Sequence, residues 1–190
     1  MKAPTLLILI LTLLIFDSCK NQQENKITKE KTAPVELESE QNKTRASIEF
    51  PIIETHLTPS ERKNKIEGVL GKINERLPEF EKKSKSLTLN EIQNTPVDIW
   101  YQNGIPIKIE HGVTDDSGEF SGKFTYYLSQ GKIWYSEQIY ARYLFENDAL
   151  KYWMDEGWNI NEIPSEDMKT RGDDLTRIIS YLVDEMKKQQ

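Results

Sequence analysis

Hydrophobic positions follow three different patterns along this chain. Residues 6–16 form an apolar run of eleven residues, with Lys2 ahead of it. A bilayer-spanning helix needs about 20 apolar residues, whereas the core of a signal peptide has about 7 to 15 behind a basic start. We therefore expect residues 1–18 to be a signal peptide that is removed.

In residues 20–47 the pattern changes to isolated aliphatic side chains among Lys, Glu, Gln, Asn and Thr. Such a composition cannot bury enough apolar surface to offset the entropy lost on ordering. The segment is predicted to be a flexible tether, with a root-mean-square reach of roughly 30 Å. A single domain is then expected to span residues 48–190.

A helix start follows at Thr58, where Pro59 suits the first helical position and Glu61 can complete a capping box. Pro78 removes a backbone donor, so it should kink the helix or end its first half near Leu77. Apolar residues recur at helical spacing and form one stripe, which we expect to pack on the protein's own sheet rather than on a partner helix or a membrane surface: Ile66, Val69, Leu70, Ile73, Leu77 and Phe80.

Between residues 97 and 155 polar dipeptides separate apolar segments and predict three β-hairpins, with turns at Asn103-Gly104, Gln130-Gly131 and Asn147-Asp148. Asn-Gly favours a type I′ turn because both central residues take positive φ, and the other two dipeptides are weaker versions of it. Two-residue turns give the later hairpins an apolar face with these pairs: Leu128 with Ile133, Tyr126 with Tyr135, Phe145 with Leu150, and Tyr143 with Tyr152.

The opposite face of these two hairpins would be unusually aromatic. Either a helix covers it, or it is an exposed platform that binds a sugar ring, a peptide or a partner protein. The candidate ligand-binding residues are Tyr127, Trp134, Arg142 and Trp153.

Residues 172–189 predict a second amphipathic helix, with Asp173 and Asp174 at its start and Lys187 near its end, as the helix dipole favours. The expected fold class is α+β. In it, a long N-terminal helix and a C-terminal helix pack on an antiparallel meander of about five to six strands.

Composition narrows the function classes. The chain has one cysteine, Cys19, so disulfides cannot staple the domain. The whole chain carries a net charge of −6; residues 1–19 contribute zero and residues 20–47 contribute +1, which leaves −7 for the rest. A domain of that sign is not expected to bind nucleic acid, which requires a basic stripe over the phosphates.

The junction Ser18-Cys19-Lys20 after the apolar run resembles a bacterial lipoprotein signal peptide, in which small and apolar residues precede the cysteine that takes the lipid. The resemblance implies that Cys19 is acylated and anchors the protein to a membrane. An aspartate after the cysteine would retain such a protein at the inner membrane, so Lys20 implies the outer membrane, facing the periplasm or the cell surface. The segment that follows, 20–24, is similar in part to a surface-export signal of Bacteroidetes lipoproteins. An ordinary secretory signal that happens to contain a cysteine is the alternative.

Two further segments, 100–109 and 126–133, resemble the YYxxGKL hairpins of a family of small secreted or lipid-anchored bacterial domains. A long amphipathic helix of INxxL type precedes the hairpins in that family, and Ile73-Asn74-Glu75-Arg76-Leu77 is similar to it. The resemblance covers roughly residues 60–155 and implies no activity.

Catalytic and metal-binding signals are sparse. The two histidines, His56 and His111, are expected at the surface, and residues 115–119 read as a hairpin loop rather than a calcium site. No cofactor fingerprint is present. Three carboxylates lie scattered on the expected strands, so only the fold could pair them: Asp98, Glu110 and Glu137.

These observations favour a lipid-anchored, non-enzymatic binding module of the cell envelope with an unknown protein, peptide or glycan ligand. A hydrolase that uses carboxylates gathered by the fold is the alternative.

Overall fold

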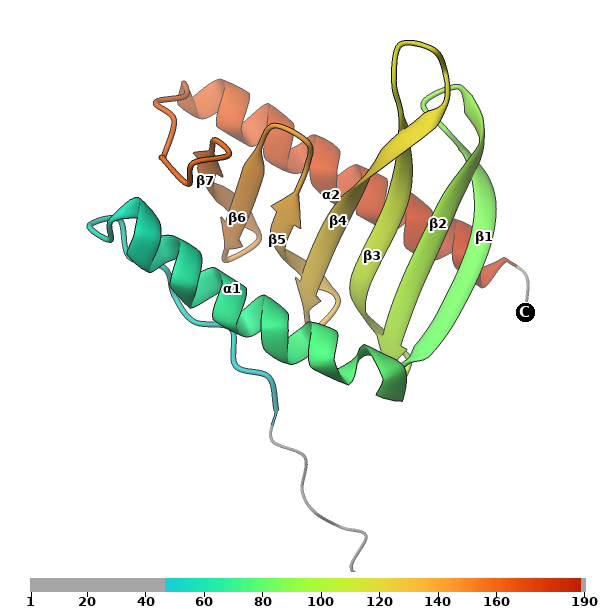
Figure 1. Cartoon of the computed structure of the whole chain (residues 1–190), viewed down its shortest axis with the longest axis horizontal. Helices are drawn as coiled ribbons and strands as arrows, with labels where there is room; N and C mark the ends of the chain where they lie inside the picture. Colours follow the sequence, from blue (N-terminus) through green and yellow to red (C-terminus); the bar gives the residue numbers. More distant parts are fainter. Residues whose placement is uncertain (1–46, 189–190) are drawn as a thin grey trace, which may run out of the picture. The chain divides into compact units, whose positions relative to one another are not determined.

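A computed structural model of the chain describes residues 47–188. In this part of the chain a seven-stranded antiparallel sheet lies between two helices, one on each face (Figure 1). The elements in chain order are α1 (Pro59–Arg76), the 3-10 helix η1 (Leu77–Glu79), β1 (Glu81–Leu89), β2 (Ile92–Gln102), β3 (Ile105–Thr114), β4 (Phe120–Ser129), β5 (Lys132–Glu137), β6 (Arg142–Glu146), β7 (Ala149–Met154) and α2 (Ser165–Lys187).

Helix α1 begins as its sequence predicts. The Thr58 hydroxyl accepts a hydrogen bond from the Glu61 amide at 3.3 Å, and the Glu61 carboxylate accepts one from the Thr58 amide at 2.9 Å, which completes the capping box. The apolar stripe is buried through Ile73, and the helix gives way to η1 one residue before Pro78. Of the two expectations for Pro78, a kink or an end, the end is confirmed. The expected place of Phe80 on the helical stripe is wrong, because Phe80 has an extended backbone after η1.

The expected α+β class is confirmed, but the expected number of five to six strands is wrong. The strands of the described sheet lie in sequence order, β1 to β7, each antiparallel to the next. Strand β1 was not predicted, because its sequence EKKSKSLTL carries three lysines and little apolar alternation. Lysines are common on edge strands, where they discourage pairing with other chains, and β1 is an edge of this sheet.

All three predicted hairpin turns form, and each is followed by a β-bulge. Both turn residues have positive φ at Asn103-Gly104, Gln130-Gly131 and Asn147-Asp148, as a type I′ turn requires. The register then gains one residue at the third position of each following strand: Ile107, Trp134 and Lys151. The pairs next to the turns, Leu128 with Ile133 and Phe145 with Leu150, are confirmed. The pairs beyond the bulges are wrong, because Tyr126 pairs with Ser136 and Tyr143 with Trp153.

The two helices bury opposite faces of the sheet. Helix α1 packs over β4–β7, with Ile66 and Ile73 fully buried, and α2 packs on the other face through Leu175 and Leu182. Helix α2 begins at Ser165 rather than near residue 172. Its additional first turns bring Gly172 against β7, where an added Cβ would lie 3.1 Å from the Leu150 Cβ.

Residues 47–57 form a strap that enters the α1 side of the domain. Ile53 is buried there, and Phe50 meets Trp134 edge to face with ring centroids 5.2 Å apart. The Tyr152 hydroxyl donates to the Ile53 carbonyl oxygen at 2.9 Å. The expectations for the signal peptide, Cys19 and most of the tether fall on residues outside the described range. Within that range, no helix combines the length and apolar character needed to cross a membrane.

Candidate functional site

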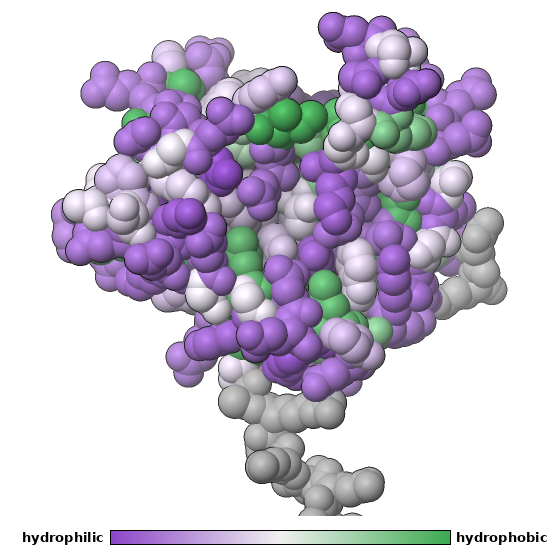
Figure 2. All heavy atoms as spheres, in the orientation of Figure 1, coloured by the Kyte–Doolittle hydropathy of each residue, from purple (hydrophilic) through white to green (hydrophobic). Residues whose placement is uncertain are grey.

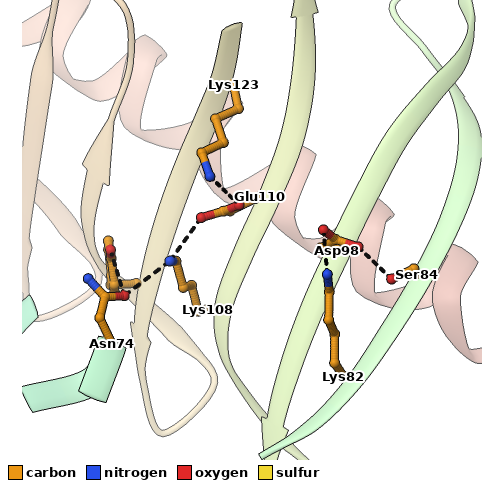
Figure 3. A network of polar contacts seen from close by, with 8 residues as sticks. Asn74, Lys82, Ser84, Asp98, Lys108, Glu110 and Lys123 are labelled. Atoms are coloured by element: carbon orange, nitrogen blue, oxygen red, sulfur yellow. Dashed lines mark hydrogen bonds and ion pairs between the residues drawn. The ribbon is translucent and has the colours of Figure 1, made fainter. Parts of the chain in front are cut away.

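Helix α1 covers only part of its face of the sheet. The core beneath it takes its sheet residues from β4–β7, while the same face of β1–β3 and of the outer half of β4 carries polar side chains (Figures 1 and 3). We call this uncovered area the open face. Its polar residues are Lys82, Ser84, Asp98, Lys108, Glu110, Lys123 and Thr125.

The strand registers align these residues, except Lys123, in two rows across the sheet; Lys123 pairs with Gly112 in the next row. One row runs Lys82, Trp100, Lys108, Tyr127, Tyr135, Leu144 and Tyr152. The next runs Ser84, Asp98, Glu110, Thr125, Glu137, Arg142 and Met154. Neighbours within a row have Cβ atoms about 4.5 to 5.5 Å apart, so their side chains interact directly. The first row turns aromatic and aliphatic where α1 covers it, whereas the second stays polar as far as β6.

Lys108 lies at the border between the open face and α1 (Figure 3). Its ammonium group is 3.0 Å from the Asn74 Oδ1 and 2.8 Å from a Glu110 carboxylate oxygen. The same group lies over the rings of Trp100 and Tyr127, at 5.2 and 5.3 Å from their centroids. These partners compensate for the burial of a cation whose side chain is only 8% exposed.

Asp98 and Glu110 lie directly opposite each other on β2 and β3. Lys82 approaches Asp98 at 2.9 Å, and Lys123 approaches Glu110 at 2.7 Å. Burial acts to raise the pKa of Asp98, but hydrogen bonds from Ser84 and Lys82 outweigh it and hold that pKa below its ordinary value. At Glu110 burial also acts to raise the pKa, and hydrogen bonds from Lys108 and Lys123 lower it overall.

These two carboxyl groups are therefore ionised at neutral pH. A glycosidase-type general acid needs a carboxyl group whose pKa is raised, so that it holds a proton at the working pH. Ionised carboxylates that are paired with ammonium groups on a rigid sheet suit the binding of a polar ligand better than proton transfer. The carboxylates can accept hydrogen bonds from such a ligand, and the ammonium groups can donate hydrogen bonds to it, without rearrangement of the side chains.

An aromatic side chain lies at each end of the open face. Trp100 is partly exposed at the end near α1. At the other end Phe120 is exposed and packs on Gly112 and Pro96: a Cβ added to Gly112 would lie 2.8 Å from the Phe120 Cδ1 and 2.8 Å from the Pro96 Cγ. Only glycine at position 112 lets the Phe120 ring approach the sheet this closely.

The exposed aromatic platform that the sequence predicts does not form from Tyr127, Trp134, Arg142 and Trp153. Tyr127 and Trp134 are 4% and 7% exposed beneath α1 and the strap, so the interpretation in which a helix covers them is confirmed for these two. Trp153 lies on the α2 face against Tyr143, with ring centroids 5.2 Å apart. Arg142 stacks on Trp158 at 4.8 Å and donates to the Asp155 carbonyl oxygen at 3.2 Å. The bulge at Lys151 moves Trp153 to the other face, which alternation alone did not predict.

His111 is buried, contrary to the expectation that it lies at the surface. Its Nε2 is 3.0 Å from the Tyr126 hydroxyl and its Nδ1 is 3.0 Å from the Gly112 carbonyl oxygen. Burial lowers the pKa of His111. The alternation of Ile107 and Ile109 with Lys108 was a signal that position 111 faces a core.

Two other expectations are confirmed, the exposure of His56 and the loop at residues 115–119. His56 is exposed, and residues 115–119 form the loop of the β3–β4 hairpin, in which the Asp115 carboxylate accepts a hydrogen bond from the Ser117 amide at 2.9 Å. Within residues 47–188 no three His, Cys, Asp or Glu side chains gather as metal ligands would.

Comparisons with protein-family models, curated proteins and solved structures gave no match for this chain.

Proposed function

We propose that the protein is a lipid-anchored binding module of the cell envelope and that its open face holds the ligand. Acylation of Cys19 would attach the chain to the outer membrane, and residues 20–47 would let the domain stand away from the lipid surface. The observation that carries the proposal is the incomplete cover of the sheet. Helix α1 buries the apolar part of its face and leaves the polar row through Asp98 and Glu110 uncovered, with these two side chains 33% and 13% exposed.

The size of the open face favours a small polar ligand over a protein. Four strands about 4.8 Å apart and five residues along each strand define an area of roughly 14 by 14 Å. A stable protein interface buries about 800 Å² on each partner and has an apolar centre. The open face is several times smaller, and its centre is charged.

Charge pairing also favours binding over hydrolysis. The lowered pKa of both Asp98 and Glu110 leaves neither as a proton donor at neutral pH, so the hydrolase alternative gains no support from this pair.

Photo-crosslinking in cells tests the proposal. A photoreactive amino acid in place of Ser84, on the open face, should become attached to envelope material. The same amino acid in place of Ser180, on the exposed side of α2, is the matched control and should remain free. Equal labelling at the two positions, or none at either, would overturn the assignment of the open face.

A further inference from the structure

We infer that the ligand of the open face is an oligosaccharide that carries acidic groups. This inference rests on the proposed function and adds the chemical class of the ligand. It is carried by three features of the open face: its two aromatic ends, its hydrogen-bonding middle and the sign of its accessible charge.

The aromatic ends are spaced for an extended ligand. Trp100 and Pro96 are four residues apart on β2, a distance of about 14 Å along a strand, and Phe120 packs on Pro96. The C–H groups on one face of a pyranose ring carry a slight positive charge, which the negative face of an aromatic ring attracts, and the exposed Phe120 ring can act in this way. The ammonium groups of Lys82 and Lys108 already lie over the Trp100 ring, at 4.9 and 5.2 Å from its centroid, so a sugar near Trp100 contacts the part of the indole that they leave exposed. A short oligosaccharide can therefore lie along β2 and β3 with a sugar ring near each aromatic side chain.

Hydrogen-bonding groups fill the space between the two aromatic residues. The carboxylates of Asp98 and Glu110 can accept hydrogen bonds from sugar hydroxyls, and so can the Ser84 hydroxyl, whose own hydrogen is donated to Asp98. The hydrogen bonds and ion pairs among these side chains hold them in place before a ligand arrives (Figure 3). A ligand with many hydroxyl groups matches this arrangement better than an apolar peptide.

The accessible charge on this face is positive. The side chains of Lys82 and Lys123 are 45% and 61% exposed, whereas those of Asp98 and Glu110, which they contact, are 33% and 13% exposed. The three lysines and two carboxylates of the open face sum to +1, on a domain of net charge −7. An approaching ligand meets ammonium groups first, so carboxylate or phosphate groups on the saccharide are attracted and the rest of the surface repels them.

Calorimetric titration of the full chain in detergent micelles tests the inference. The acidic probes are tetragalacturonate and a hyaluronan oligosaccharide, the neutral probe is maltotetraose, and the non-saccharide anion is tetraglutamate. At least one acidic saccharide should bind, with an affinity that falls steeply as salt is added. Maltotetraose should bind at least tenfold more weakly, and tetraglutamate should not compete.

Three variants assign the binding to the open face. Lys123→Gln and Trp100→Ala should each weaken the binding of the acidic saccharide at least fivefold. Lys132→Gln is the matched control, because Lys132 is similarly exposed at 67% and also pairs with a carboxylate, that of Asp148, but lies outside the open face. Gly112→Ala should weaken binding by displacing the Phe120 ring, and a circular dichroism spectrum like that of the parent would show that the fold is kept.

The outcomes separate this inference from the proposed function. Absence of binding by both acidic saccharides, or equal binding of maltotetraose, would overturn the acidic-saccharide inference. Labelling at Ser84 in cells would in that case still support the open face as a binding site. Equal loss of affinity in Lys123→Gln and Lys132→Gln would place the saccharide elsewhere on the molecule.

Discussion

The Lys108 ammonium group reaches from β3 to the side-chain oxygen of Asn74 on α1, at 3.0 Å. The Tyr127 hydroxyl donates to the same oxygen at 3.2 Å. One amide oxygen thus receives two hydrogen bonds from neighbouring strands, at the line where the covered half of the sheet meets the open face. This contact ties α1 to β3 and β4, and it holds Lys108 in place beside Glu110.

Replacing Asn74 by alanine should lower the free energy of unfolding by about 1 kcal/mol, because two buried donors, Lys108 and Tyr127, lose their acceptor. Asn74 itself is exposed, so water can replace its oxygen in part. Asn74→Asp is the control and should cost less, because it keeps an acceptor at this place. Urea unfolding measures both variants. Equal losses would mean that an oxygen acceptor at this position does not account for the contribution of Asn74.

Trp134→Ala should lower the free energy of unfolding by about 3 to 5 kcal/mol, the range for a large buried aromatic side chain. Its indole is buried against Phe50 of the strap. Tyr140→Ala is the control, because Tyr140 is 79% exposed and should change stability by less than about 0.5 kcal/mol. A Trp134→Ala variant as stable as the parent would contradict the packing of the strap.

Stability should fall as the pH drops below about 6.5 because of His111. Its folded-state pKa is lowered by burial, so the unfolded chain binds the proton more readily, and acid favours unfolding by at most about 1.4 kcal/mol for each pH unit. His111→Gln should lessen the loss measured by denaturant unfolding between pH 7.5 and 5.5. His56→Gln, at an exposed position, should leave it unchanged; the reverse pattern would contradict the prediction.

Cys19 is predicted to be the acylated first residue of the mature protein. Globomycin should block cleavage of the signal peptide, and Cys19→Ala should prevent lipid attachment, both readable by mass spectrometry of protein from its native membrane. An unmodified Cys19 in that material would contradict the lipoprotein interpretation.

Residues 20–47 are predicted to add nothing to the stability of the domain. A chain that starts at Ile48 should therefore unfold cooperatively at the same midpoint temperature as one that starts at Lys20. A midpoint lower by more than a few degrees would mean that the tether docks on the domain.

Local sequence signals predicted the start of α1, its end shortly before Pro78 and the three hairpin turns, because each depends on a few adjacent residues. The faces of the later strands could not be predicted. A bulge adds one residue to a strand and moves every side chain beyond it to the opposite face of the sheet. Nothing in the sequence indicated that bulges would occur at Trp134 and Lys151. The lysine-rich β1 also lacked the alternation that predicts a strand.

The candidate site could not be predicted from the sequence for a similar reason. Asp98 and Glu110 become opposite neighbours only through the register of β2 and β3, and their exposure depends on where α1 stops. The sequence did place both carboxylates on strands. It held no information on which half of the sheet a helix would cover.

The contacts at the two ends of the described chain also bear on the order of folding. Each strand pairs with its neighbour in sequence, so the sheet closes only short loops. The contacts that join the strap to β7 and α2 to β1 span far more chain: Tyr152 to Thr55 covers 97 residues, and Lys85 to the Glu185 carbonyl oxygen covers 100. Their closure costs more chain entropy than any hairpin. The meander can therefore form strand by strand during synthesis. Helix α2, which covers one apolar face of the sheet, is made after all seven strands, and until then that face stays exposed.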